Sequence, residues 1–344
     1  MRSKQELWSQ VHHGWNLGNA LDSFCFERPG TGRGETEWGN PPVTKELLDT
    51  VAAAGFDLLR IPVTWFEHFE DGSGTIQKEW MDRVQEIVDW GIQDGFFVIL
   101  NMHHENSWMF NSGKALPEVS EIYRNCWRQI AGRFRDYPDA LLFEAMNEPR
   151  IEGADREWSG ETAEVREKIN HLQRIFVREV RSMPSHADRT LLLTTCGAVP
   201  NEVALRDLWI PEDSNIAVSL HLYQPGEFCN PHVPEEESVL WTKDGLRKVE
   251  ETFSCIQTHL TKRDIPVVLT EFGAADHHNE REAARWAENV VQLAARQHIS
   301  CIWWDNNSRK EDGDGFAILQ RENLQWVRPL IRDVLTGDCR ALSN

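Results

Sequence analysis

The chain has 344 residues, and 36 lysines and arginines against 55 aspartates and glutamates give it a net charge of −19. This balance argues against nucleic acid and anionic membranes as partners, and it favours a neutral substrate and a soluble monomer. Apolar residues make up 40% and charged residues 26%, as in ordinary globular proteins, and the length suffices for a large core. We therefore expect one folded domain over residues 1–344.

Neither a membrane span nor an export signal is evident in the sequence. No stretch has the length of a spanning helix, and the residues before His13 lack the apolar core of a signal peptide. We expect a cytosolic protein, or a secreted one from which a signal has been removed. The odd number and wide spacing of the seven cysteines predict reduced, mostly buried thiols, with one disulfide left open; they are Cys25, Cys126, Cys196, Cys229, Cys255, Cys301 and Cys339.

Short apolar runs alternate along the chain with longer amphipathic segments. The near-continuous apolarity of the runs predicts parallel strands that are covered on both faces. The expected strands are Gly14–Asn19, Asp57–Pro62, Phe96–Met102, Ala140–Asn147, Thr190–Thr195, Ile216–Leu222, Pro266–Glu271 and Ser300–Asp305.

The amphipathic segments between these runs predict helices, several of which are bounded by proline or glycine. The expected helices are Thr44–Ala54, Gln77–Asp94, Glu118–Arg135, Thr162–Met183, Pro200–Leu208, Thr242–Lys262, Glu280–Gln297 and Asn323–Thr336. Strict alternation predicts the α/β class and a single (β/α)8 barrel. An open doubly wound sheet also alternates, but it usually has a glycine-rich phosphate loop after its first strand, which Gly14–Asn19 lacks.

Polar side chains gather where the predicted strands end. In a (β/α)8 barrel these ends form the active-site face, and a polar group at the end of an apolar strand needs a partner. The residues at these positions are Asn19, Arg60, His103, His104, Asn147, Glu148, His221, Tyr223, Glu271, Trp303, Trp304 and Asp305. We expect them to converge on one cavity.

Two carboxylates, Glu148 and Glu271, end strands on opposite sides of the predicted ring. Either alone could be a helix-capping or surface glutamate, but together they form the pair that glycoside cleavage requires. One carboxyl donates a proton to the leaving oxygen, and the other attacks the anomeric carbon. A separation of about 5–5.5 Å gives retention of configuration, and about 6.5–9.5 Å gives inversion.

Seven strings resemble glycoside hydrolase family 5 of the large retaining clan, in order over essentially the whole chain. They are GWNLGN (14–19), LLRIPVTW (58–65), NMHHE (101–105), FEAMNEP (143–149), HLY (221–223), LTEFG (269–273) and WWDN (303–306). The string GETEWGNP (34–41) resembles the cellulase and xyloglucanase branch, close to subfamily 4. The resemblance implies a retaining glycosidase on a TIM barrel.

The resemblance also implies roles for individual residues. Glu148 matches the acid/base and Glu271 the nucleophile. Asn147 matches the residue that binds the sugar 2-hydroxyl, and Arg60 the guanidinium that keeps the nucleophile ionised. An arginine beside only one carboxyl would give the two carboxyls the unequal pKa values that the reaction needs.

The remaining polar matches lie around this pair. His221 and Tyr223 match the residues that adjust the acid/base and the nucleophile, and His103 matches the histidine of subsite −1. Adjacent strand residues point to opposite faces, so we expect His103 in the cavity and leave open whether His104 binds substrate or packs. We also expect Asn19 to contact substrate.

Aromatic residues are candidates for sugar platforms, because sugar CH groups stack on indole faces. We expect Trp304 to form the floor under the −1 sugar and Trp303 to lie in the core. Among the loop tryptophans, Trp65 is the first candidate platform and Trp38 the second. Trp108 and Trp241 could equally pack on the barrel rim.

We expect neither a metal nor a cofactor. The clusters His103-His104-Glu105 and His277-His278 lack the i, i+4 spacing of a helical zinc site. The predicted activity is an endo-β-1,4-glucanase, with xyloglucan and mixed-linkage glucan as further substrates. A β-mannanase, an exo-acting enzyme, a metal-dependent barrel hydrolase and a non-catalytic polysaccharide-binding barrel remain alternatives.

Overall fold

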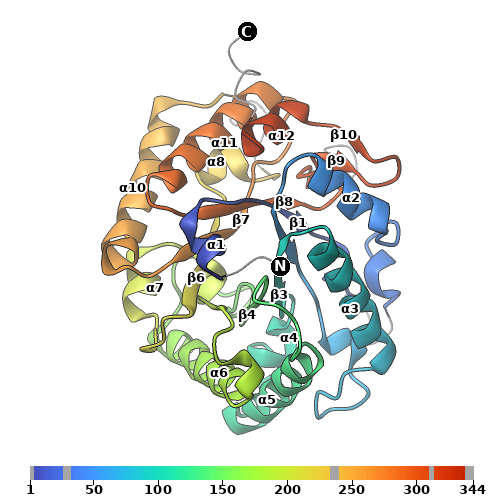
Figure 1. Cartoon of the computed structure of the whole chain (residues 1–344). Helices are drawn as coiled ribbons and strands as arrows, with labels where there is room; N and C mark the ends of the chain where they lie inside the picture. Colours follow the sequence, from blue (N-terminus) through green and yellow to red (C-terminus); the bar gives the residue numbers. More distant parts are fainter. Residues whose placement is uncertain (1–3, 26–31, 233–239, 310–313, 338–344) are drawn as a thin grey trace.

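The computed structural model describes residues 4–25, 32–232, 240–309 and 314–337. Eight parallel strands form a closed barrel in which every strand pairs with its neighbours in the sequence (Figure 1). The barrel strands are β1 (His13–Leu17), β2 (Leu58–Ile61), β3 (Phe97–Asn101), β4 (Leu141–Glu144), β5 (Leu191–Thr194), β6 (Ile216–Leu222), β7 (Val267–Phe272) and β8 (Ser300–Asp305). The predicted fold class is confirmed.

Helices surround the barrel and cover its outer face (Figure 1). The larger ones are α2 (Lys45–Ala53), α3 (Lys78–Gln93), α5 (Leu116–Arg133), α6 (Ala163–Arg181), α7 (Glu202–Asp207), α10 (Lys243–His259), α11 (Glu280–Ala295) and α12 (Pro329–Leu335). Three begin one residue after the predicted start, because Thr44, Thr162 and Thr242 are N-caps whose side chains accept a hydrogen bond from the first turn.

The final helix is shorter than the predicted Asn323–Thr336. It starts at Pro329, and the residues before it form a small antiparallel pair, β9 (Leu319–Gln320) with β10 (Gln325–Trp326). Leu324, between these strands, has a φ of 58°, which a right-handed helix does not allow. Proline is favoured in the first turn, where its missing N–H leaves no hydrogen bond unmade.

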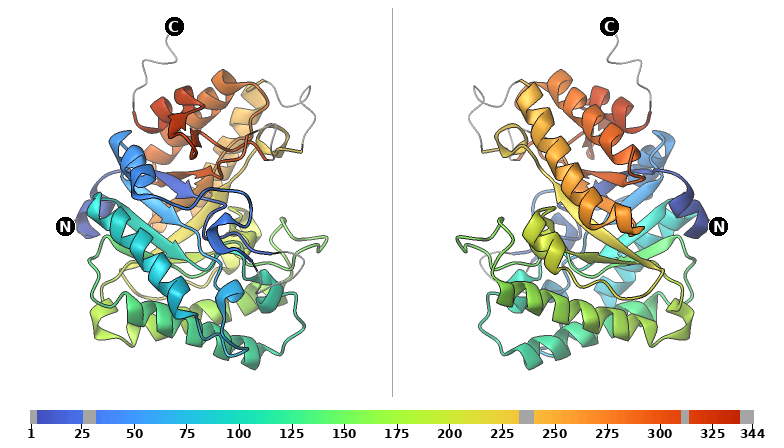
Figure 2. Two further views of the ribbon diagram at one scale, coloured as in Figure 1. Left: turned by 90° about the vertical axis from the view of Figure 1, so that its right-hand side faces the viewer. Right: turned by 90° about the vertical axis from the view of Figure 1, so that its left-hand side faces the viewer.

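The two ends of the barrel differ in character. At the N-terminal end, α1 (Lys4–Ser9) lies across the opening, and Leu7 packs into an apolar cluster with Leu58, Phe97 and Ile302. Figure 2 shows α1 on one side of the molecule and the long connecting loops on the other. A barrel closed by apolar contacts at one end leaves the C-terminal ends of its strands for a binding site.

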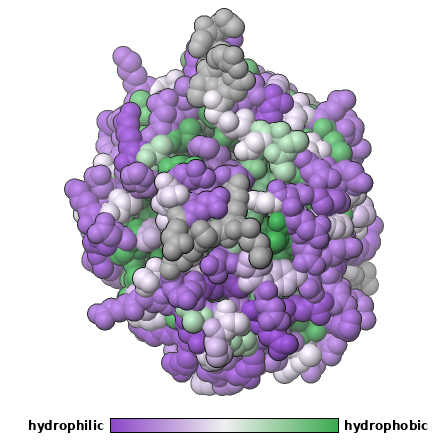
Figure 3. Space-filling view, in the orientation of Figure 1, coloured by the Kyte–Doolittle hydropathy of each residue, from purple (hydrophilic) through white to green (hydrophobic). Residues whose placement is uncertain are grey.

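The face shown in Figure 3 is mostly hydrophilic, with hydrophobic residues confined to small areas. Within the described ranges, no helix combines the length and apolarity needed to cross a membrane. The six cysteines that the structure describes are free thiols, and four of them are buried; Cys339 lies outside the described residues.

Candidate active site

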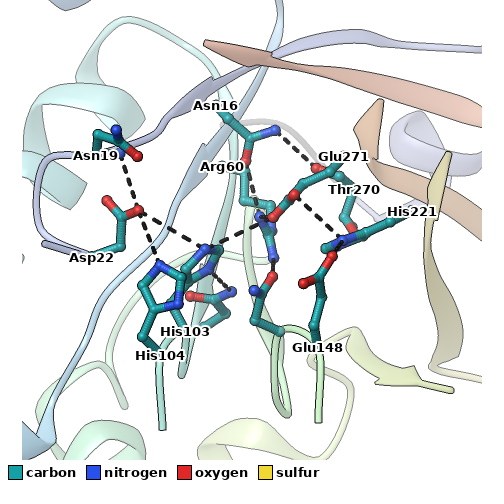
Figure 4. A network of polar contacts seen from close by, with 12 residues as sticks. Asn16, Asn19, Asp22, Arg60, His103, His104, Glu148, His221, Thr270 and Glu271 are labelled. Atoms are coloured by element: carbon teal, nitrogen blue, oxygen red, sulfur yellow. Dashed lines mark hydrogen bonds and ion pairs between the residues drawn. The ribbon is translucent and has the colours of Figure 1, made fainter. Parts of the chain in front are cut away.

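A cavity of about 540 Å³ lies over the C-terminal ends of the strands. Most of the predicted strand-end residues line it: His103, His104, Asn147, Glu148, His221, Tyr223, Glu271 and Trp304. The close-up in Figure 4 shows several of these side chains converging from different strands around Arg60. The predicted convergence on a single cavity is confirmed for these residues.

Arg60 is fully buried and lies at the centre of the site. Its Nε donates to Glu144 Oε2 at 2.7 Å and its Nη1 to Glu271 Oε1 at 2.7 Å. The remaining hydrogen bonds reach Asn16 Oδ1 at 3.0 Å and Asn147 Oδ1 at 2.8 Å. Burial alone would lower the guanidinium pKa, but the two carboxylates raise it above its ordinary value. Arg60 is therefore a permanent cation held against Glu271.

Glu271 lies near the end of β7, where the pairing with β6 changes register and places His221 opposite it. The hydroxyl of Tyr223 donates to Glu271 Oε2 at 2.9 Å, so both carboxylate oxygens have partners. Burial raises the pKa of this carboxyl above its ordinary value, and the charges of His221 and Arg60 oppose that rise only in part. Two fixed donors hold the carboxylate in one orientation at the floor of the cavity.

Glu148 follows β4 and faces Glu271 across the cavity. His221 Nδ1 lies 2.8 Å from Glu148 Oε1, and Arg150 Nη1 donates to Glu148 Oε2 at 3.2 Å and to its main-chain oxygen at 2.9 Å. Burial raises the pKa of the Glu148 carboxyl, but the hydrogen bond to His221 and the charge of Arg150 lower it to a value below the ordinary one.

The expected arrangement, with an arginine beside only one of the two carboxyls, is wrong. Arg60 contacts Glu271 and Arg150 contacts Glu148, so each carboxyl has its own guanidinium. The pKa of Glu148 is lowered and that of Glu271 is raised, which is the reverse of the expected split. Arg150 was missed because it lies in the loop after β4 rather than at a strand end. Its position shortly after Glu148, in the string NEPR, was the signal that could have identified it.

His221 lies between the two carboxyls, 2.8 Å from Glu148 and 3.4 Å from Glu271. One oxygen of each carboxyl and a ring nitrogen of His221 all lie within 4.8 Å of one another. This close approach fits the short carboxyl spacing of retaining enzymes better than the wider spacing of inverting ones. At such distances the charge states of Glu148 and Glu271 depend on each other.

His103 and His104 both line the cavity, although alternation on a strand placed them on opposite faces. The prediction that His103 faces the cavity is confirmed. The two side chains do not alternate, because β3 ends at Asn101, before either histidine. Their rings lie 4.5 Å apart at 87°, and their Nε2 atoms lie 3.9 and 3.8 Å from Asp22 Oδ2. Burial lowers the pKa of His103 well below its ordinary value and that of His104 to about 4, so both rings are neutral at neutral pH.

The tryptophans separate into cavity and core. Trp304 lines the cavity, parallel to the His103 ring at 5.6 Å, whereas Trp303 is fully buried and donates to the main-chain oxygen of Phe316, as predicted. Trp65 is also fully buried, and its Nε1 donates to the main-chain oxygen of Asn101 at 2.9 Å. The prediction that Trp65 is a sugar platform is therefore wrong, because neither indole face is accessible.

Trp38 and Asn19 lie beside the cavity, and neither is among the residues that line it. The Trp38 ring packs 5.5 Å from His104, which does line the cavity. Asn19 has a φ of 56°, and its main-chain N–H donates to Asp22 Oδ2 at 3.0 Å. Asn19 thus orients Asp22 through its main chain rather than facing the cavity.

Trp158 is an aromatic lining residue that the sequence did not reveal. It lies in the loop between β4 and α6, lines the cavity and is 53% exposed, more than any other large hydrophobic lining residue. The Arg150 guanidinium lies 4.3 Å from the centre of its ring. This cation–π contact places the exposed indole of Trp158 next to the side chain that contacts Glu148.

Comparison with known proteins agrees with this geometry. Residues 23–310 match the family model of cellulase, glycosyl hydrolase family 5. The chain is 36% identical to Endoglucanase A of Ruminococcus albus, over 98% of this chain and 93% of that protein. It is also 36% identical to Endoglucanase B of Neocallimastix patriciarum, over 97% of this chain and 72% of that protein.

Solved structures give the same result. One is XEG5A, a xyloglucan-specific endo-β-1,4-glucanase from a metagenomic library, in complex with cellotriose. It aligns with a TM-score of 0.91 and 36% identity, over 97% of this chain and 98% of that one. Another is a broad-specificity endoglucanase from Clostridium longisporum, with a TM-score of 0.90, 34% identity and coverage of 100% and 99%. The chain belongs to the cellulase family, glycosyl hydrolase family 5.

Proposed function

We propose that this protein is a retaining endo-β-1,4-glucanase that cleaves internal bonds of soluble β-glucans, including xyloglucan. The observation that carries the proposal is the pair Glu148 and Glu271, which face each other at short range with His221 between them. The family and the endoglucanase relatives support a β-1,4-glucan as the substrate class. We also propose that the barrel acts as a single catalytic domain and as a monomer.

In the proposed reaction Glu271 is the nucleophile. Its carboxylate attacks the anomeric carbon and forms a covalent glycosyl–enzyme ester, while Glu148, in the protonated form that the reaction requires, donates its proton to the departing sugar oxygen. Glu148 then removes a proton from water, which attacks the same carbon and releases Glu271. Two inversions at one carbon give net retention.

The surroundings of the pair support this division of roles. Arg60 and Tyr223 hold both oxygens of Glu271, which fixes one lone pair toward the cavity. Asn147 is anchored by Arg60 and lines the cavity beside them, and we propose that it binds the sugar 2-hydroxyl. Prepositioned groups of this kind lower the barrier without reorganisation during the reaction.

Two aromatic rings in the cavity, Trp304 against His103 and Trp158 against Arg150, support binding of several sugar units. We propose that Trp304 carries the sugar on the nucleophile side and that Trp158 carries a sugar on the leaving-group side. Both rings line the cavity. We assign His103 and His104 to hydroxyl contacts, and Trp38, behind His104, to a more distant sugar unit.

A hydrolysis panel tests the substrate proposal. Carboxymethyl cellulose, barley β-glucan, xyloglucan and mannan are incubated with the protein, and viscosity and reducing ends are measured together. We expect the β-glucans to lose viscosity early, as internal cleavage requires, and mannan to remain intact. Cleavage of mannan alone would identify a β-mannanase, and release of short products without loss of viscosity would identify an exo-acting enzyme.

The stereochemistry of the first product tests the mechanism separately. Proton NMR during the first minutes of hydrolysis should show the β-anomer, and activity should survive EDTA. An initial α-anomer would rule out the double displacement. Loss of activity in EDTA would support the metal-dependent alternative instead.

Replacement of Arg150 by glutamine should change the pH dependence of the reaction. The charge of Arg150 lowers the pKa of the Glu148 carboxyl, so its removal raises that pKa. A general acid must be protonated, and we therefore expect the alkaline limb of the kcat/KM profile to move to higher pH. Arg150→Lys keeps the charge and is the matched control, for which the limb should stay near that of the wild type. An acid-ward shift in Arg150→Gln would show that Arg150 does not act on Glu148 through its charge.

A further inference from the structure

Three potential metal ligands meet on the outer wall of the barrel, at residues that the catalytic cavity does not use. Cys255 and His259 lie one helical turn apart on α10, and Glu202 is the first residue of the neighbouring helix α7. Side chains at i and i+4 of a helix point from the same face, so the thiol and the imidazole approach Glu202 together.

The distances among these ligands are close to those of a tetrahedral site. His259 Nε2 lies 2.7 Å from Glu202 Oε2, and Cys255 Sγ lies 4.0 Å from the same oxygen. One ligand atom of each of the three residues lies within 4.8 Å of the other two. Metal–ligand bonds of about 2.0–2.3 Å place tetrahedral ligands roughly 3.3–3.6 Å apart, so side-chain shifts of under about 1 Å would suffice.

The types of ligand atom in this group indicate which metal ion it would bind. Thiolate, imidazole and carboxylate together suit Zn²⁺, whereas Mg²⁺ and Ca²⁺ prefer oxygen ligands alone. Glu202 is exposed and the other two residues are partly exposed, so an ion can enter and a water molecule can complete the coordination. The protein's net charge of −19 also favours the approach of cations.

We propose that Cys255, His259 and Glu202 form a surface Zn²⁺ site that joins α10 to α7, separate from the catalytic cavity. Binding releases the thiol proton to solvent, because the thiolate is the ligand. Burial and the charge of Glu202 raise the pKa of the Cys255 thiol, so the unbound protein holds this proton at neutral pH. The ion links helices that follow consecutive strands, β5 and β6, and is therefore expected to stabilise that side of the barrel.

Calorimetric titration of the whole, chelator-treated protein with Zn²⁺ tests the site. We expect binding of one equivalent, a rise in Tm on binding, and unchanged hydrolysis of β-glucan at that equivalence. Cys255→Ser and His259→Gln should each weaken this binding at least about tenfold, which corresponds to about 1.4 kcal/mol. Co²⁺ used in place of Zn²⁺ should give the charge-transfer band of a cobalt–thiolate bond, and Cys255→Ser should abolish the band.

Cys25→Ser is the matched control, because Cys25 is the other partly exposed cysteine among the described residues. It should leave Zn²⁺ binding and the cobalt band unchanged. Retained β-glucan hydrolysis in all variants shows that they are folded, since none of these residues lines the cavity. Zn²⁺ binding that survives Cys255→Ser and inhibits hydrolysis would overturn the proposal and place the ion at Asp22, His103 and His104, the ligand group beside the cavity.

Discussion

Glu271→Gln is expected to reduce the rate of β-glucan hydrolysis at least about 10⁴-fold, because an amide does not attack the anomeric carbon. The side-chain shape and an oxygen acceptor for Arg60 or Tyr223 are retained. The variant should therefore fold, and its affinity for cello-oligosaccharides should be close to that of the wild type. Steady-state kinetics on barley β-glucan and calorimetry with cellotetraose measure the two quantities.

Glu148→Gln provides the comparison that separates the two roles. It should also be inactive on polymers, but the formation of the glycosyl–enzyme should recover with an aryl glycoside whose leaving group needs no proton. Glu271→Gln should show no such recovery. A wild-type rate in Glu271→Gln would refute the assignment of Glu271 as the nucleophile. Recovery with the aryl glycoside in Glu271→Gln, and not in Glu148→Gln, would show that the two roles are reversed.

Arg60→Met is expected to impair both stability and catalysis. The substitution leaves Glu144 and Glu271 buried without their shared cation, and breaking a buried ion pair in this way costs about 3–5 kcal/mol. It also frees the Glu271 carboxylate from one of its two donors, for which we expect a loss of at least about 10²-fold in kcat. Urea unfolding and steady-state kinetics measure the two effects.

Arg60→Lys is the control that keeps the charge. A lysine ammonium does not reproduce the planar fork that reaches Glu144, Glu271, Asn16 and Asn147 at once, so both losses should be smaller but still measurable. An Arg60→Met variant as stable as the wild type would show that the buried carboxyls are neutralised by other means.

The barrel and its two glutamates could be predicted from the sequence because they depend on short-range patterns. Buried parallel strands read as apolar runs, and a polar group that ends such a run is conspicuous. Arg60, Glu148 and Glu271 were found in this way, and the structure brings them together as expected. The helix starts at Thr44, Thr162 and Thr242 were predictable because capping is local chemistry.

The directions of side chains in the loops could not be predicted, because they depend on the path of the chain after each strand. Trp65 and Trp158 both lie in loops, yet one is fully buried and the other is 53% exposed. Composition does not distinguish an indole in the core from one in a cavity. His104 was left open because it lies beyond the end of β3, where alternation no longer sets the direction of a side chain. Arg150 was missed because it lies in the loop after Glu148, past the apolar run that ends there.

The buried contact between Arg60 and Glu144 has a consequence for the charge balance of the catalytic cycle. In the proposed reaction Glu271 becomes an uncharged ester, so Arg60 loses one of its two anionic partners halfway through each turnover. Glu144, fully buried and bonded to both Arg60 and Ser219, takes no part in the chemistry and stays paired with the guanidinium at that stage. The guanidinium is therefore never an uncompensated charge in the barrel interior, and the glycosyl–enzyme does not bear the electrostatic cost of one. Glu144 acts as a resident counterion that lets the nucleophile be neutralised and restored in every cycle.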